Sequence, residues 1–103
     1  MIHVIATIEV APGKRADVLE AFAWVSPFVH AENGCIEYGT AVDVTTVVSA
    51  NQLPPRSDVI VVVEKWADLA ALQAHSQASH MSEYRQRVTG LVQKVSLQIL
   101  EPA

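Results

Sequence analysis

Hydrophobic and polar residues alternate along three stretches of the chain with the period of two that a β-strand imposes on its side chains, and a fourth stretch, residues 59–66, is a short valine-rich run. From this alternation and the abundance of β-branched residues, we predict strands over residues 2–10, 35–48, 59–66 and 91–100. On the first strand, the residues on one side are all apolar: Ile2, Val4, Ala6, Ile8 and Val10. The opposite side carries His3, Ile5, Thr7 and Glu9.

Two other segments repeat their apolar residues at the spacing of an α-helix. The apolar stripe of the first consists of Val18, Leu19, Phe22, Val25 and Val29. Pro27 is expected to disturb the last turn of this helix. The second begins at Leu69, directly after Asp68, which is a favourable N-cap residue. It continues to Gly90, with a break predicted over residues 76–79.

The predicted elements follow the order β-α-β-β-α-β within a single domain, residues 1–103. This order is that of the ferredoxin-like α+β fold, in which both helices cover one face of the sheet and the third strand lies between the first and second. The prolines and polar residues of 49–58 predict an exposed loop between the second and third strands, long enough to cover a pocket.

The third predicted strand is apolar on both sides, with Val59, Val61 and Val63 on one and Ile60, Val62 and Trp66 on the other. Helices can cover only one of these sides. An uncovered apolar sheet face would form an interface-like patch, so we predict that the second face lines a ligand cavity, packs against a partner sheet in a homodimer, or does both.

Composition narrows the function classes. Half of the residues are hydrophobic and 17% are charged, and the net charge is −4. Without a basic patch, nucleic acid is not an expected partner. The longest apolar run is too short for a membrane span and the first residues do not resemble a signal peptide, so we expect a soluble, cytoplasmic protein. The single Cys35 cannot form an internal disulfide, and we assign it no chemistry.

Candidate chemistry concentrates between Glu64 and Met81. Trp66 shares a strand face with Glu64, and His75 lies on the apolar stripe of the second helix. His80 would lie about 140° further round an unbroken helix, although the predicted break could bring the two histidines together. With no additional cysteine or carboxylate at ligand spacing, we predict no metal site. Core packing for Trp66 and His75, and a solvent-exposed strand end for Glu64, are the alternatives.

Three stretches resemble the antibiotic biosynthesis monooxygenase superfamily: HVIATIEVAPGKRADVLEAF, AENGCIEYG and VVVEKWADLAALQAHSQASHM. The third is the most specific, because it combines a strand ending in Glu-x-Trp, a helix with Ala-Leu-x-x-His, and a second histidine five residues later. The resemblance extends over nearly the whole chain. It implies a dimeric α+β barrel built from two copies of the ferredoxin-like domain.

Members of this superfamily include cofactor-free oxygenases of phenols and quinols, haem-degrading enzymes, and isomerases of small sugar-derived signals. The haem-degrading members pair an asparagine on the first strand and a histidine in the second helical region with the tryptophan. This chain has Thr7 and Arg85 at those places. The departure argues against haem, and we expect no cofactor. Motifs for nucleotide binding and for hydrolytic nucleophiles are absent from the sequence.

The resulting hypothesis is a cofactor-independent monooxygenase that oxidises a small phenol or quinol with O2. Its base would be His75 or His80, and Trp66 would act with them at the catalytic centre. The residues expected to contact the substrate are Glu64, Tyr38, Tyr84, His3 and Val62. His3 is included because we expect it to face the same cavity as Trp66. By contrast, His30 and Glu32 are interpreted as a solvated surface pair.

Two other functions stay open. An isomerase of a small oxygenated metabolite would use His75 and Glu64 as an acid/base pair without oxygen. A non-catalytic dimeric binding module would use Trp66 and the valines only to line a pocket or interface.

Overall fold

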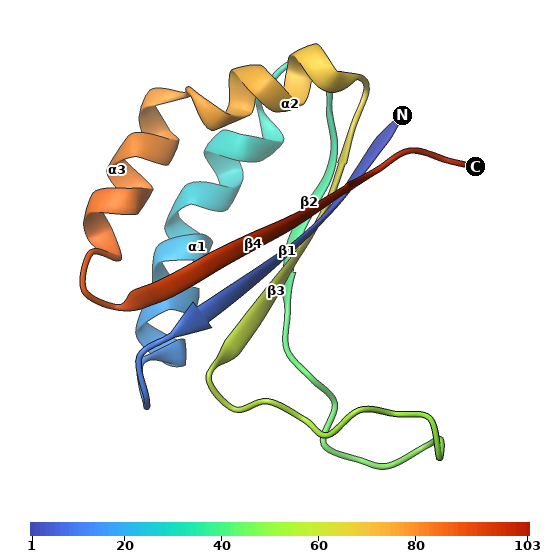
Figure 1. Cartoon of the computed structure of the whole chain (residues 1–103). Coiled ribbons are helices and arrows are strands. Elements are labelled where there is room, and N and C mark those ends of the chain that lie inside the picture. Colours follow the sequence, from blue (N-terminus) through green and yellow to red (C-terminus); the bar gives the residue numbers. More distant parts are fainter.

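Seven helices and strands follow one another in the predicted order in the computed structural model, which describes all 103 residues. They are β1 (Ile2–Val10), α1 (Arg15–His30), β2 (Cys35–Ala41), β3 (Val59–Trp66), α2 (Leu69–Ser76), α3 (Ser79–Arg87) and β4 (Val92–Leu100) (Figure 1). The second predicted helix is thus two helices, as the predicted break requires. None of the three helices combines the length and apolar character that crossing a membrane requires.

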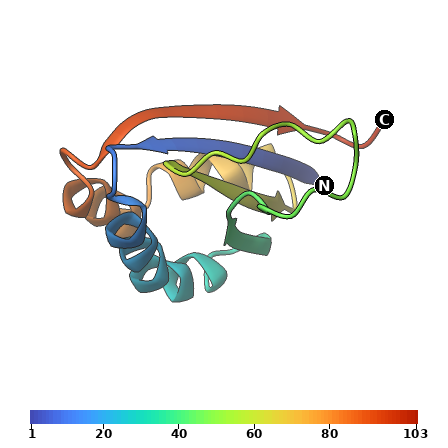
Figure 2. The same ribbon diagram turned by 90° about the horizontal axis from the view of Figure 1, so that it is seen from below.

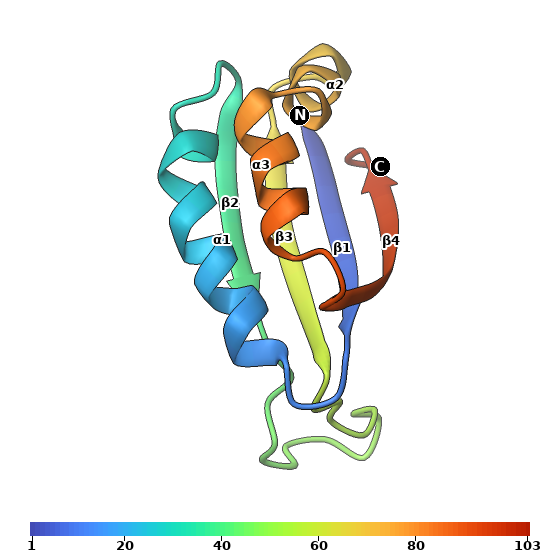
Figure 3. The same ribbon diagram turned by 90° about the vertical axis from the view of Figure 1, so that its left-hand side faces the viewer.

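The four strands form one antiparallel sheet in the order β2-β3-β1-β4. This order places β3 between β1 and β2 and confirms the ferredoxin-like α+β fold. Figure 3 shows α1 and α3 in front of the sheet, with β4 at the far edge from β2. Figure 2 shows β4 and β1 on one side of the molecule and α1 on the other. The chain therefore has two layers, and its helices cover one sheet face.

The core lies between these layers. Strand pairing places Val4 opposite Glu64 and Ala6 opposite Val62, so the even-numbered residues of β1 and β3 face the helices. From α1, Val18, Phe22, Val25 and Val29 are buried against them. Each fully buried valine contributes roughly 1.5–3 kcal/mol relative to an exposed one. The apolar stripe of α1 and the alternation of the strands therefore meet as predicted.

Strand β2 is shorter than the sequence predicts. It ends at Ala41, which pairs with Val61, whereas we predicted a strand to residue 48. Because β3 starts at Val59, residues 44–48 extend past the start of that strand and have no partner with which to form a ladder. Alternation and β-branched residues do not make a strand without a partner. The loop therefore spans residues 42–58 and extends away from the sheet (Figure 1).

The break between α2 and α3 redirects the chain. Asp68 caps α2 as predicted, because its Oδ1 accepts a hydrogen bond from the Ala71 N–H at 2.8 Å. The helix ends at Ser76, and Ala78 adopts an extended conformation before α3 begins. The Arg85 guanidinium donates to the free carbonyl of Ser76 and so stabilises the break. The residues after the break no longer follow the face of α2.

Candidate functional site

A cavity of about 330 Å³ lies between the sheet and the helices. Most of its lining is apolar, and the polar lining residues are Tyr38, Glu64, His75, Ser76, Tyr84 and Arg85. For the helix-free face we had left open a ligand cavity, a partner sheet or both, whereas this cavity lies on the helix-covered face. The cavity forms on the covered face because Val95 and Leu97 of β4 turn toward the helices but remain about half exposed. The layers therefore do not close completely at this edge.

Trp66 shares a face of β3 with Glu64, as predicted, and this face is the one that the helices cover; its side chain is fully buried. Its Nε1–H donates to Glu64 Oε1 at 2.9 Å, and its ring lies 4.6 Å from the ring of His75. Because this single donor is already used, the indole does not point a free N–H into the cavity. Trp66 is not among the residues that line the cavity, but it contacts Glu64 and His75, which are.

Glu64 is a buried carboxylate, with 6% of its surface exposed. Burial raises the pKa of Glu64 above its ordinary value of 4.5, although the Trp66 hydrogen bond and the nearby His75 oppose this shift. The solvent-exposed alternative for Glu64 is therefore wrong. A buried acid must be hydrogen-bonded or stay protonated, and the Trp66 N–H supplies the hydrogen bond for Glu64.

The raised pKa of Glu64 predicts a specific pH dependence. The folded chain binds the Glu64 proton more tightly than the unfolded chain does. The contribution of this proton to the unfolding free energy is therefore fully present below about pH 4.5, and it is lost as the pH rises through the raised pKa of Glu64. Glu64→Gln keeps a carbonyl oxygen for the Trp66 N–H but carries no charge. We expect the variant to unfold at a higher temperature than the native chain at neutral pH and the two to converge below about pH 4.5. Thermal unfolding between about pH 4 and pH 8 measures this. Parallel curves over that range would contradict a raised pKa.

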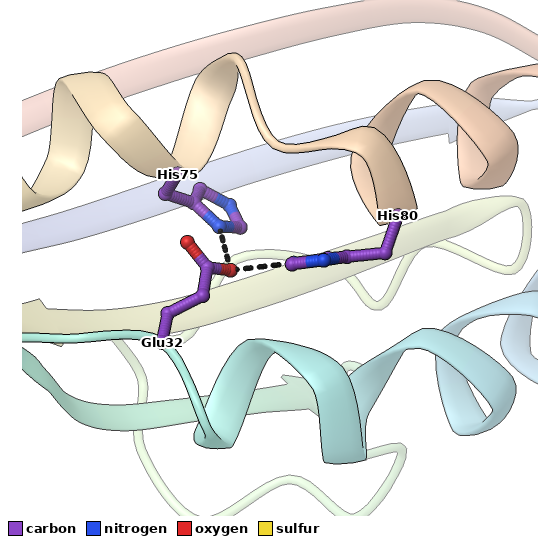
Figure 4. A group of neighbouring side chains, drawn as sticks. All are labelled: Glu32, His75 and His80. Atoms are coloured by element: carbon purple, nitrogen blue, oxygen red, sulfur yellow. Dashed lines mark hydrogen bonds and ion pairs between the residues drawn. The ribbon is translucent and has the colours of Figure 1, made fainter.

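His75 and His80 converge on one carboxylate oxygen (Figure 4). His75 Nδ1 and His80 Nε2 each lie 2.8 Å from Oε2 of Glu32. The helix break allows this arrangement, since an unbroken helix would direct the two imidazoles away from each other. The other ring nitrogen of His75, Nε2, lies 4.0 Å from Glu64 Oε1. The three ligand-type atoms of Glu32, His75 and His80 lie within 4.8 Å of one another.

Glu32 is the functional candidate that sequence analysis missed. We interpreted Glu32 and His30 as a solvated surface pair, but the Glu32 side chain is only 12% exposed and bonds to two histidines. His30 bonds instead to the backbone oxygen of Tyr38. The sequence shows only that an acidic residue stands directly before the Asn33-Gly34 turn. It does not show which element this turn packs against.

Gly34 places this turn against α2. Its φ of +83° is favourable only for glycine, and a Cβ built at this position would lie 2.6 Å from Ala71 Cβ. The Gly34 carbonyl also accepts a hydrogen bond from the Ala67 N–H at 2.8 Å. The close approach brings the end of α1 to the start of α2, and Glu32 thereby reaches His75.

The remaining candidates divide between the two sheet faces. Tyr38, Tyr84 and Val62 line the cavity. Burial raises the pKa of both tyrosine hydroxyls, which therefore stay protonated and able to donate. His3 pairs with Lys65 on the face opposite Trp66, so our expectation that it faces the cavity was wrong. The error arose because the cavity lies on the helix-covered face, whereas His3 lies on the free one.

Cys35 shows no sign of activation. Burial, together with the nearby Glu32 and Glu64, raises the pKa of its thiol. A raised pKa lowers the fraction of reactive thiolate. This agrees with assigning Cys35 no chemistry.

Comparison with known proteins provides independent information on the family. The model of the antibiotic biosynthesis monooxygenase family matches residues 1–87. An Escherichia coli K12 protein named "Probable quinol monooxygenase YgiN" is 40% identical over 104 residues, which cover 99% of this chain and 98% of that protein.

Solved structures agree with the fold. PA3566 from Pseudomonas aeruginosa is 25% identical with a TM-score of 0.79, covering 99% of this chain and 93% of that one. Rv0793 from Mycobacterium tuberculosis is 24% identical with a TM-score of 0.77, covering 99% and 94%. The fold, the family match and the full-length similarity agree, and the chain belongs to the antibiotic biosynthesis monooxygenase family.

Proposed function

We propose that this chain is a cofactor-independent monooxygenase that oxidises a small quinol or phenol with O2, and that His75 is its base. The observation that carries the proposal is the placement of His75, a buried imidazole that lines an apolar cavity and bonds to Glu32 on its far side. Similarity to a protein named as a probable quinol monooxygenase supports a quinol as substrate. The cavity volume lies within the range of about 300–1,000 Å³ typical of small-molecule sites.

Glu32 gives His75 the orientation and tautomer of a base. A carboxylate only accepts hydrogen bonds, so the imidazole donates from Nδ1 and leaves the lone pair on Nε2. Nε2 lies on the side of Glu64, which also lines the cavity. This arrangement lets Nε2 accept the proton of a phenolic hydroxyl bound in the cavity. His80 holds the same Glu32 oxygen and acts as a positioning residue.

Other lining residues suit the anion that deprotonation creates. The hydroxyls of Tyr38 and Tyr84 are protonated donors, and Arg85 is the only lysine or arginine among the lining residues. Donors held in an apolar, water-poor site stabilise negative charge more strongly than water-exposed ones do. The aliphatic side chains, including Val62, give the radical intermediates that follow a mostly apolar surrounding.

The proposed reaction needs no protein-bound electron carrier. A hydroquinone anion gives one electron to O2, and the resulting semiquinone and superoxide combine at a ring carbon. Loss of water from the hydroperoxide then leaves a hydroxyquinone. One oxygen atom enters the ring, and the other leaves as water with two hydrogen atoms of the substrate. The protein contributes the base, the donors and the apolar cavity.

Oxygen uptake by metal-free and flavin-free protein with a panel of hydroquinones and phenols tests the proposal. Uptake above the uncatalysed rate, with a product heavier by one oxygen and lighter by two hydrogens, is the expected result. The His75–Glu64 pair would also suit the isomerase alternative, which consumes no oxygen. If the protein converted the substrate while oxygen was consumed no faster than without protein, the oxygenase proposal would be wrong.

The helix-free sheet face supports a homodimer. Ile5, Val59, Val61 and Val63 lie on this face and are only partly buried within the chain. Sheet-to-sheet packing of two copies would bury this apolar surface. We expect the native chain to have twice its monomer mass by light scattering, and Val61→Lys to shift the population to monomer because it buries an unpaired charge. Monomeric native protein would contradict the dimer.

A further inference from the structure

We propose that Glu32, His75 and His80 form a binding site for a divalent transition-metal ion, with Zn²⁺ as the reference ion. The site uses two imidazole nitrogens and one carboxylate oxygen, the ligand types that zinc prefers alongside thiolate. The proposal goes beyond the metal-free oxygenase activity. It also revises the expectation of no metal site, which assumed that no carboxylate lies near the two histidines.

The ligand atoms lie close enough for one ion to gather them with a small rearrangement of the two imidazoles. His75 Nδ1 and His80 Nε2 are each 2.8 Å from Glu32 Oε2, and all three atoms lie within 4.8 Å of one another. Zinc bonds of roughly 2.0–2.2 Å place neighbouring ligand atoms roughly 2.9–3.4 Å apart at angles between 90° and tetrahedral. The distances to Glu32 already match this spacing, whereas the two imidazole nitrogens, up to 4.8 Å apart, must approach each other by about 1 Å for one ion to bind all three atoms.

The three side chains are held by separate parts of the fold. Glu32 precedes the Gly34 turn, while His75 and His80 belong to α2 and α3 (Figure 4). Their side chains are 12%, 8% and 20% exposed. The Glu32 carboxylate bonds to no lysine or arginine, and its polar partners are the two imidazoles. The site thus presents a largely buried carboxylate with no competing fixed cation.

An outer partner and an entry route are also present. Metal-binding histidines usually donate their second ring N–H to a carboxylate, and His75 Nε2 faces Glu64 Oε1 at 4.0 Å. Trp66 in turn holds Glu64 through its N–H. On the other side, Glu32 lines a surface hollow of about 420 Å³, together with Asn33 and Asp68. The hollow reaches Glu32 but neither histidine, so an ion and its water ligand would enter past the Glu32 carboxylate.

Metal binding and base catalysis would exclude each other. An ion on Nδ1 of His75 takes the lone pair at that atom, so the neutral ring carries its proton on Nε2. Nε2 can then donate but not accept a proton. The same three atoms would therefore serve a metal-free active state and a metal-bound state in which the proposed base is blocked.

Titration of chelator-treated protein with Co²⁺, followed by visible absorption, and with Zn²⁺, followed by calorimetry, tests the site. We expect one ion per chain and a higher unfolding temperature with Zn²⁺. Glu32→Gln and His80→Ala should each weaken binding by at least about 100-fold. Glu64→Gln, which alters only the outer partner, should weaken binding about 10–100-fold. The control is His3→Ala, which removes a histidine from the opposite face and should leave the affinity unchanged.

The metal site would be wrong if the native chain bound no stoichiometric ion. It would also be wrong if Glu32→Gln and His80→Ala bound the ion as tightly as the native chain does. Circular dichroism establishes that each variant is folded, and His80→Asn offers a second variant if His80→Ala is not. These readouts do not depend on activity. A chain that binds Zn²⁺ but consumes no oxygen when it is metal-free would contradict the oxygenase proposal alone, and a chain that consumes oxygen but binds no Zn²⁺ would contradict only the metal site.

Discussion

Replacement of His75 by alanine is expected to lower the rate of quinol oxidation by metal-free protein about 10²–10⁴-fold, the usual contribution of a general base. His75 is the only histidine that lines the cavity, and Glu32 directs its unprotonated Nε2 toward the side of Glu64. Without the imidazole, solvent must remove the phenolic proton. Oxygen uptake as a function of substrate concentration separates a loss of kcat from a loss of binding.

Two other histidines provide the controls for His75→Ala. His80→Ala removes one of the two hydrogen bonds that hold Glu32, so we expect a smaller loss of rate than for His75→Ala. His3→Ala changes the other sheet face and should leave the rate unchanged. If His75→Ala kept its activity while His80→Ala lost it, the assignment of the base to His75 would be wrong.

Replacement of Gly34 by alanine is expected to cost about 2–5 kcal/mol of unfolding free energy. A left-handed conformation costs a residue with a Cβ about 1–2 kcal/mol. The new methyl group would also lie 2.6 Å from Ala71 Cβ, and overpacking of this kind costs typically 1–3 kcal/mol more. Chemical denaturation of folded protein measures the loss. Because the same contact brings Glu32 to His75, the rate of quinol oxidation should fall as well.

Gly13→Ala is the matched control. Gly13 has a φ of +76°, close to that of Gly34, but a Cβ at this position would meet nothing within 4 Å. We expect it to cost only the conformational penalty of about 1–2 kcal/mol. The difference between the two variants isolates the contact of the turn with α2. Equal losses would show that this contact contributes nothing.

The elements of the fold could be predicted from the sequence because each has a local cause. Alternation marked β1 and β4, the valine-rich run marked β3, and the Asp68 cap marked the start of α2. The pairing of Trp66 with Glu64 on one strand face also follows from the period of two alone. These signals arise within a few residues, so neighbouring residues suffice to detect them.

The identity of the site depended on tertiary structure. Periodicity reports which side of an element is apolar, but it does not reveal what lies opposite. It therefore extended β2 past the start of its partner strand and placed His3 at the cavity. Glu32 lies 43 residues from His75 and 48 from His80 in the chain. Only the close approach at Gly34 and the break between α2 and α3 bring these groups together, and that convergence is a property of packing between elements.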